Sequence, residues 1–217
     1  MAYSFTAASS QYLSTSSSPV GVAPLTLACW FYPNTITANY VLFQISDGNT
    51  TNRHGLGALG GVTGDPLRVF SNGTLGGATE GFADSTIGFT ASTWQHACGV
   101  IGGINSRTVY LNGANSATNS NTSSQQNINQ INIASRPANG VAGLFLDGLI
   151  AEVGIWNADL TAAEIASLAK GMTCDKVRPQ SLVFYAPLVR DLVDQKGGLT
   201  ITNNNGATVA AHTRVYA

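Results

Sequence analysis

Turn-forming dipeptides divide this sequence into short apolar runs at close intervals. Asn-Gly, Asp-Gly or Gly-Gly pairs stand at 47–48, 60–61, 72–73, 76–77, 112–113 and 147–148. Asn-Gly and Asp-Gly accept positive φ and favour tight hairpins. The strand-like runs are 25–32, 40–46, 66–73, 94–101, 107–113, 128–135, 145–156, 182–188 and 198–202. A parallel sheet would need a helical pattern after nearly every strand, so the spacing predicts an all-β fold, an antiparallel two-sheet sandwich.

One segment departs from the strand pattern. Thr161 and Glu164 fit a capping box, with Thr161 as the N-cap, and Leu160 and Ile165 fit the accompanying hydrophobic staple. The pattern predicts one short surface helix near 162–170, packed on the sandwich with a structural role.

Composition excludes several classes of protein. The 217 residues suit one all-β domain, and we expect 1–217 to be a single domain. Lys and Arg number 10 against 11 Asp and Glu, with no basic cluster, which argues against nucleic acid as a partner. No run approaches the ~18 apolar residues of a membrane span. The first residues, MAYSFTAASSQYL, lack a charged region followed by an apolar stretch, so we expect no signal peptide.

Three cysteines give no disulfide framework, because their number is odd and their spacing irregular. Cys29 and Cys98 lie in apolar strand-like runs, where free cysteine behaves as a small buried hydrophobe. A Cys29–Cys98 bridge stays open as an alternative. Without a CxxC pair, a structural zinc site is not expected, and the chain suits a reducing compartment.

The acidic residues do not form a glycosidase pattern. Glycoside hydrolysis usually needs two facing carboxyl groups, and residues on one face of a strand are two apart. No acidic pair has that spacing within a strand-like run. Asp147 is explained by its turn, and Glu152 is an isolated acid in an apolar strand, expected to hydrogen-bond at a sheet edge or to a loop. GxSxG and P-loop motifs are missing too. We therefore predict no catalytic residues and no enzymatic activity.

The histidines do not predict a metal site either. His54, His96 and His212 are far apart and lack HExxH or HxH spacing. We expect no metal and no cofactor. His96 should be a packed strand residue, whereas His54, in a polar segment, should be exposed.

One loop gathers groups that can bind a ligand. A carboxylate, amides, a guanidinium and an imidazole fall within eight residues and could hydrogen-bond a sugar or a neighbouring subunit. These candidate ligand-binding residues are Asp47, Asn49, Asn52, Arg53 and His54. The alternative interpretation is a solvated hairpin loop.

Four segments in order carry a family resemblance: LTLACWFYP (25–33), TWQHACGVI (93–101), RTVYLNGA (107–114) and FLDGLIAEVGIWNADLTAAEIASLAKG (145–171). They resemble the concanavalin A-like lectin/glucanase superfamily, in the laminin G-like or pentraxin-like branch found in many bacterial and phage proteins. The resemblance implies a jelly roll. The alternating acids of laminarinase-like members and the clustered acids of calcium-dependent members are not in this sequence, so the resemblance implies neither activity here.

Two functions from different classes fit the resemblance. The first is a non-enzymatic structural component of a virion, a capsid decoration or cement protein or a comparable tail or fibre subunit, located in the virion and assembled in the host cytoplasm. Its partners would be other virion proteins and, in a homo-oligomer, further copies of itself. The alternative is a glycan-binding, lectin-type module for a host receptor, with surface glycans as partners.

Three structural expectations complete the prediction. Trp30, Trp94 and Trp156 lie in apolar runs and should be mostly buried. The resemblance to jelly rolls implies that the N-terminal and C-terminal segments lie side by side, and the need to cover both sheet edges supports this. The polar segment 112–127 should be a long surface loop, and short strand pairing within it stays open as an alternative.

Overall fold

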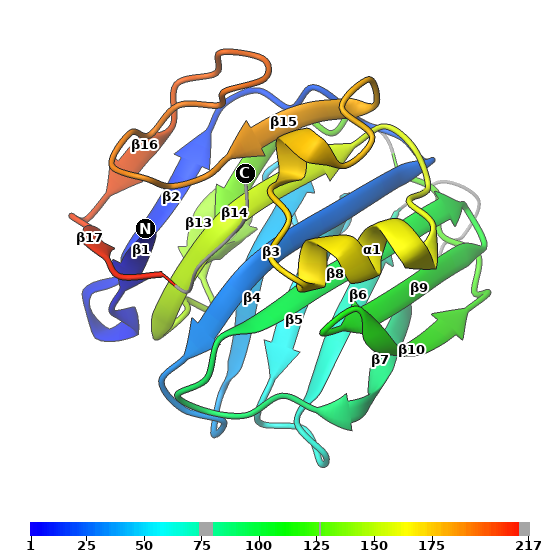
Figure 1. The fold of residues 1–217 in the computed structure, drawn as a ribbon, viewed down its shortest axis with the longest axis horizontal. Helices are drawn as coiled ribbons and strands as arrows, with labels where there is room; N and C mark the ends of the chain where they lie inside the picture. Colours follow the sequence, from blue (N-terminus) through cyan, green and yellow to red (C-terminus); the bar gives the residue numbers. More distant parts are fainter. Residues whose placement is uncertain (74–79, 126, 213–217) are drawn as a thin grey trace.

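The computed structural model describes residues 1–73, 80–125 and 127–212. Two antiparallel sheets form a sandwich (Figure 1), which confirms the predicted all-β jelly roll. Sheet A runs in the order β10 (Ala114–Asn119), β9 (Ser106–Leu111), β8 (Gln95–Gly103), β3 (Leu25–Pro33), β14 (Gly148–Trp156), β1 (Ala2–Phe5) and β17 (Thr208–Ala210), with β15 (Leu182–Ala186) also paired to β14. The Gly-Gly pair at 76–77 lies outside the described residues.

Sheet B packs against sheet A. Its order is β16 (Thr202–Asn204), β2 (Tyr12–Thr15), β11 (Gln130–Ile133), β4 (Asn39–Ser46), β5 (Arg53–Leu59), β6 (Pro66–Asn72) and β7 (Gly81–Gly88). A separate hairpin consists of β12 (Arg136–Ala138) and β13 (Val141–Gly143). Short 3₁₀ turns occur at Ala7–Ser9 and Cys174–Lys176.

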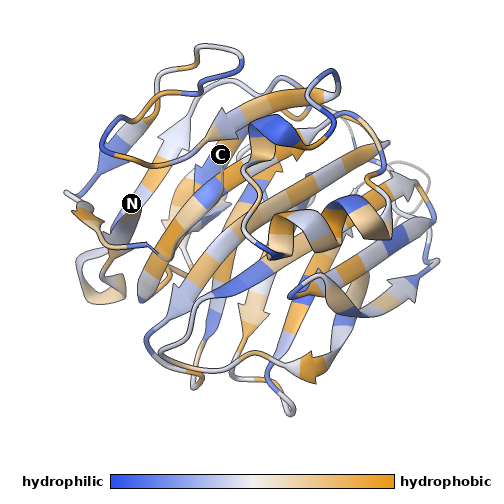
Figure 2. Ribbon diagram, viewed as in Figure 1, coloured by the Kyte–Doolittle hydropathy of each residue, from blue (hydrophilic) through white to orange (hydrophobic). Residues whose placement is uncertain are grey.

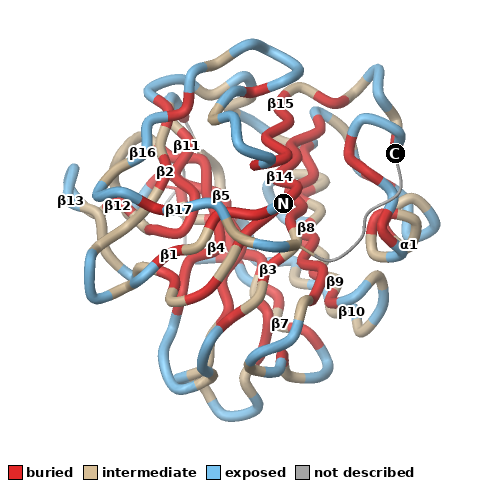
Figure 3. Tube along the Cα trace, turned by 60° about the vertical axis from the view of Figure 1, so that its left-hand side comes forward, coloured by how far each residue is buried: buried red, intermediate tan, exposed pale blue. Residues whose placement is uncertain are grey.

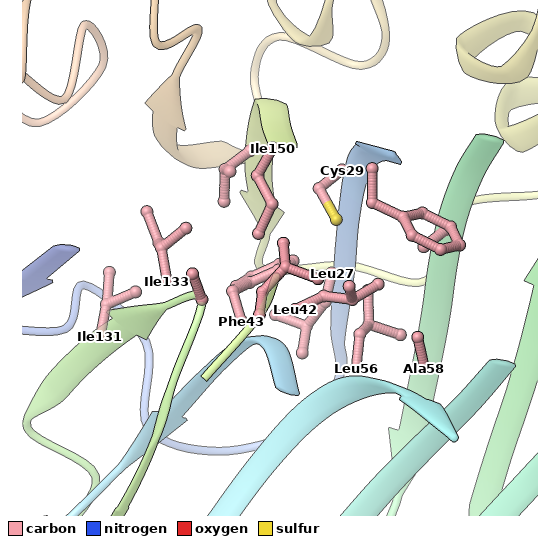
Figure 4. Close-up of a cluster of buried hydrophobic side chains, with 14 of the residues drawn as sticks. Leu27, Cys29, Leu42, Phe43, Leu56, Ala58, Ile131, Ile133 and Ile150 are labelled. Atoms are coloured by element: carbon pink, nitrogen blue, oxygen red, sulfur yellow. The ribbon is translucent and has the colours of Figure 1, made fainter. Parts of the chain in front are cut away.

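The core lies between the two sheets and follows from strand alternation. In β3, Leu27 and Cys29 point inward, and in β5, Leu56 and Ala58 do the same. Figure 4 shows these side chains meeting Phe43 of β4 and Ile150 of β14. Apolar and polar residues alternate along the strands in Figure 2, and the buried chain in Figure 3 runs through the middle of both sheets. Because apolar burial is the main driving force of folding, this alternation fixes which face of each strand turns inward.

The predicted helix is confirmed as α1 (Ala162–Ala169), which lies over β8 in Figure 1. The Thr161 side chain accepts a hydrogen bond from the Glu164 backbone, and the Glu164 side chain accepts one from the Thr161 backbone, which completes the capping box. Leu160 and Ile165 are both buried, as a hydrophobic staple requires. The helix therefore closes a second, smaller apolar cluster on the outer face of sheet A.

The three tryptophans differ in how deeply they are buried. Trp156 is fully buried in the cluster beneath α1, and its Nε1 donates a 2.8 Å hydrogen bond to the Val177 carbonyl. Trp30 and Trp94 have intermediate exposure, since they lie on the outer face of sheet A. There the His212 ring packs edge-on, with centroids 6.0 Å from Trp30 and 4.4 Å from Trp94. All three are more buried than exposed, as predicted, but only Trp156 is fully so.

The first and last strands confirm the predicted adjacency of the chain ends. Ala2 pairs with Ala210 and Ser4 with Thr208, in an antiparallel register of β1 with β17. In the segment 112–127, the strand β10 pairs with β9, so the short strand pairing left open as an alternative is present at its start.

All three cysteines are free and buried, as small hydrophobes would be. Cys29 pairs in register with Ala97, and Cys98 pairs with Ala28. Neighbouring residues of a strand point to opposite faces. Cys29 therefore lies in the core between the sheets while Cys98 lies in the cluster beneath α1, so the alternative Cys29–Cys98 bridge is wrong.

No helix in the described ranges is long and apolar enough to cross a membrane.

Candidate functional site

The polar groups of the predicted ligand-binding loop, at residues 47–52, hydrogen-bond to one another. The Asp47 carboxylate accepts one from the Asn49 backbone at 2.9 Å and one from the Asn52 amide at 3.0 Å. The Asp47 backbone N–H donates to the Asn52 carbonyl at 3.2 Å. These bonds make residues 47–52 a self-contained turn between β4 and β5.

Arg53 and His54 follow this turn and diverge. They are the first two residues of β5, so their side chains point to opposite faces of sheet B. His54 points inward and is 1% exposed, so the expectation that it is exposed was wrong. The polar residues around His54 are typical of a loop, and they gave no sign that His54 belongs to a strand. Of the five predicted residues, Asp47, Asn49 and Asn52 lie together in the turn. Arg53 and His54 lie on opposite faces of sheet B, away from that group.

His54 is part of a buried polar group at one end of the sandwich. Its Nδ1 lies 2.8 Å from the Ser71 hydroxyl, and the Ser123 hydroxyl donates to the Ser71 carbonyl at 3.0 Å. Burial, and then the charge of Arg107, lower the pKa of His54 to about 3. His54 is thus neutral at physiological pH and serves the packing of the core.

Glu152 also has a structural environment. It sits at a bulge in β14, where the neighbouring strand changes from β1 to β15, and it has φ of 53°. Its side chain is buried and accepts a hydrogen bond from Tyr185. The expected hydrogen bonding is present, but inside sheet A rather than at a sheet edge, because three different strands meet β14 here.

The outer face of sheet B, turned away from sheet A, carries the groups best placed for a ligand. Strand pairing aligns its side chains in rows across the sheet. One row is Ser14, Asn132, Gln44, Gly55, Phe70 and Phe82, and the next is Gly57, Arg68 and Asp84. The first row thus runs from hydroxyl and amide side chains at β2 and β11 to aromatic rings at β6 and β7.

Glycines in β5 let an aromatic ring lie against the sheet. A Cβ added at Gly55 would stand 2.4 Å from the Phe70 ring and 2.7 Å from the Gln44 Cβ. The Arg53 guanidinium lies over the Phe70 ring with its Cζ 4.6 Å from the centroid, and Arg68 lies 3.7 Å over Phe82. Each pair has cation–π geometry, which holds the long arginine side chains against the face.

A pocket of about 230 Å³, here called the arginine pocket, opens beside these rings. Its floor includes Gly57 and Phe70, and its rim includes Arg53, Arg68 and Arg136. Arg136 comes from the β12–β13 hairpin, which packs on β4. The hairpin therefore supplies one wall of a pocket whose floor is sheet B.

A second pocket, of about 170 Å³, lies on the other side of the same hairpin. We call it the amide pocket. Gln130 and Asn132 of β11 line it together with Ser14 and Ser16, and the hairpin contributes Ala142. The Asn132 Oδ1 is buried and has no hydrogen-bond partner among the described residues.

The predicted loop adjoins this site in the sequence, but most of its residues do not line the pockets. Only Arg53 of the five predicted residues lines a pocket described here. The signal that could have found the rest is alternation: 53, 55 and 57 share one face of β5, and 68, 70 and 72 share one face of β6. Arg136 carried no such signal, because only the folded hairpin brings it to sheet B.

Across the described parts of the chain, no three His, Cys, Asp or Glu side chains are grouped so as to hold a metal ion.

The family follows from a match over most of the chain. Residues 7–166 match the family model of the concanavalin A-like lectin/glucanases superfamily. The chain belongs to this superfamily, as the resemblance of its strand motifs implied. A search of curated proteins found no match to the sequence.

Solved structures share the fold at low sequence identity. A native heptameric SAP-like pentraxin from Limulus polyphemus is 16% identical, with a TM-score of 0.63 over 91% of this chain and 87% of that one. The CBM40 of a Ruminococcus gnavus IT-sialidase, bound to α2,3-sialyllactose, is 11% identical, with a TM-score of 0.58 over 69% and 84%. Domain 4 of a Geobacillus stearothermophilus extracellular arabinanase, in complex with arabinotriose, is 18% identical, with a TM-score of 0.53 over 69% and 68%.

Proposed function

We propose that this chain is a non-catalytic carbohydrate-binding domain whose ligand contacts the outer face of sheet B. The observation that carries the proposal is the pair of pockets on either side of the β12–β13 hairpin. Together they offer amide and hydroxyl groups, guanidinium groups and a partly apolar floor, which are the groups a sugar uses for orientation and stacking. Two of the similar structures hold a glycan, α2,3-sialyllactose in one and arabinotriose in the other, and this supports the same ligand class here.

The non-catalytic part of the proposal rests on the acids at this face. Asp84 accepts hydrogen bonds from Arg68 Nε at 2.6 Å and Arg68 Nη2 at 2.7 Å, so both of its oxygens are engaged. Glu80 lies 3.6 Å from Arg53. With Asp84 engaged by Arg68, Glu80 has no free acidic partner among the residues that line the two pockets, whereas glycoside hydrolysis usually uses two facing carboxyl groups. Incubation with polysaccharides such as laminarin and alginate should release no reducing ends.

A binding experiment tests the glycan proposal. A panel of neutral and acidic oligosaccharides is titrated by calorimetry against the wild-type protein and against two pocket-blocking variants, Ala142→Trp and Gly57→Ala. Ala142 lines the amide pocket, and a Cβ at Gly57 would occupy the floor of the arginine pocket. The matched control is Ala163→Trp, at an exposed position on α1. Loss of binding in a pocket variant but not in the control supports the proposal, and wild-type protein that binds no glycan on the panel contradicts it.

The virion role stays a prediction, since neither the pockets nor the similar proteins bear on it. It predicts that purified protein adds stoichiometrically to capsid shells that lack it. Self-association belongs with it: one similar structure is a heptamer, and the solution mass of this protein would test for a homo-oligomer.

A further inference from the structure

The three guanidinium groups around the arginine pocket are unequally partnered. Arg68 is fully engaged by Asp84 through two short hydrogen bonds. Arg53 has one looser ion pair, with its Nη2 3.6 Å from Glu80 Oε1, and its Nε has no hydrogen-bond partner among the described residues. The Nε of Arg136 is likewise buried and unpartnered there.

This arrangement leaves positive charge without sufficient compensation. Arg53 is only 7% exposed, and a buried cation is costly unless its donors are paired. Burial and, to a smaller extent, the charge of Arg136 lower the pKa of Arg53, while Glu80 opposes this. Arg53 and Arg136 therefore place two positive charges and two unpaired N–H donors beside one pocket. An anion in the pocket would compensate the charges and accept hydrogen bonds from the donors.

We propose that the arginine pocket binds the carboxylate of an acidic sugar residue, held by the guanidinium groups of Arg53 and Arg136. The inference rests on the proposed function, because it names the class of glycan that the outer face of sheet B selects. A planar guanidinium matches a carboxylate in a two-pronged, charge-assisted hydrogen bond. The pocket lining also includes the apolar side chains of Val41, Leu59 and Leu144, which can contact the C–H groups of the sugar ring beside the carboxylate.

Glu80 is a carboxylate of the protein that occupies part of the position proposed for the ligand carboxylate. Its carboxylate already approaches Arg53, but from 3.6 Å and with a side chain that is 42% exposed. At this distance, and with its Glu80 end open to solvent, the ion pair is weak, so a ligand carboxylate can displace it. Glu80 thus acts as a competitor for Arg53, and its removal should strengthen binding of an acidic sugar.

The experiment compares matched acidic and neutral ligands on the full chain. Trigalacturonate is paired with its methyl ester, and 3′-sialyllactose is paired with lactose. The variants are Arg53→Met, Arg136→Met and Glu80→Gln, with Arg190→Met as the control because Arg190 is exposed and lines neither pocket. Thermal unfolding of each variant shows whether it is folded, and the partly exposed Arg136 keeps the test valid should Arg53→Met fail to fold.

The expected result is a preference of the wild type for at least one acidic ligand over its neutral partner. Loss of one charge-assisted hydrogen-bonding group should weaken that binding about tenfold or more in Arg53→Met or Arg136→Met. Glu80→Gln should bind more tightly, Arg190→Met should bind as the wild type does, and the affinity for the neutral ligand should not change.

Three results overturn the inference. Equal affinity for the acidic and the neutral ligand of a pair would be consistent with glycan binding but would contradict recognition of the carboxylate. Equal weakening by Arg190→Met would indicate general attraction by charge. Binding of a sulfated oligosaccharide, titrated as a further ligand, but of neither carboxylated ligand would assign another anion. If no glycan binds at all, the proposed function fails together with this inference.

Discussion

The Tyr185 hydroxyl donates a 2.6 Å hydrogen bond to Oε2 of Glu152 inside sheet A. Glu152 is 4% exposed, and burial raises its pKa from 4.5 to about 7 in spite of this bond. Burial also raises the pKa of Tyr185, and the Glu152 charge raises it further. The pair therefore couples the stability of the bulge in β14 to protonation near neutral pH.

Glu152→Gln should stabilise the protein in alkaline solution relative to acidic solution. A carboxyl whose folded pKa is raised keeps its proton longer in the folded state, so its contribution is complete below the unfolded value of 4.5 and is lost as pH rises through about 7. Glutamine resembles the protonated acid and does not titrate, so the variant does not lose this stability as pH rises. The difference in unfolding free energy between variant and wild type should grow by on the order of 2–3 kcal/mol from pH 4.5 to 8.5.

Urea unfolding at both pH values measures this difference. Tyr185→Phe serves as the comparison, since it keeps the titrating carboxyl but removes a donor that lowers the pKa of Glu152, so its stability should still fall as pH rises, over a range that extends to higher pH than in the wild type. A Glu152→Gln effect that is the same at both pH values would contradict the assignment.

The histidines should destabilise the fold on acidification. Burial lowers the pKa of His54 and His96 to about 3 and that of His212 to about 4, whereas unfolded histidine titrates near 6.5. The unfolded chain therefore takes up protons first, and stability falls as pH drops from about 6.5 toward these values. Measured in the Glu152→Gln background, which removes the opposing carboxyl, the free energy of unfolding should decline steadily from pH 7 to 4.

His212→Phe isolates one of these groups. Phenylalanine keeps the edge-on ring contact with Trp30 and Trp94 but cannot titrate. The variant should match its parent near pH 7.5 and lose less stability between pH 6.5 and 4. Superimposable pH profiles for the two proteins would mean that His212 does not contribute.

Trp156→Ala should be far more damaging than Trp30→Ala. Trp156 is fully buried and bonded to the Val177 carbonyl, so truncation leaves both a cavity and an unpaired carbonyl. We expect a loss of about 3–5 kcal/mol, and a smaller loss for the partly exposed Trp30. Urea unfolding measures both losses, and equal losses would show that Trp30 is packed as tightly as Trp156 in the cluster beneath α1.

The three thiols should be unreactive in the folded protein. Burial raises the pKa of Cys29, Cys98 and Cys174, and only the thiolate reacts readily. A thiol-specific chromogenic reagent should label none of them in native buffer and all three in guanidinium chloride, without prior reduction. A signal below three thiols after unfolding would reveal a disulfide.

The sequence by itself determined the class of fold and several local features. Turn pairs and apolar alternation predicted the antiparallel sandwich, and the spacing of Thr161 and Glu164 predicted the capped helix. These features are local, because a turn or a cap depends on residues a few positions apart. The order of matching motifs also indicated the superfamily.

Only the tertiary structure decided which polar side chains share a surface. Asp47, Arg53 and His54 are close in sequence, yet one closes a turn, one borders a pocket and one enters the core. Arg136 is far from Arg53 along the chain, yet it lines the same pocket. Alternation tells which residues of one strand share a face, but strand pairing and hairpin packing join residues of distant segments, and these long-range contacts depend on the packing of the whole chain.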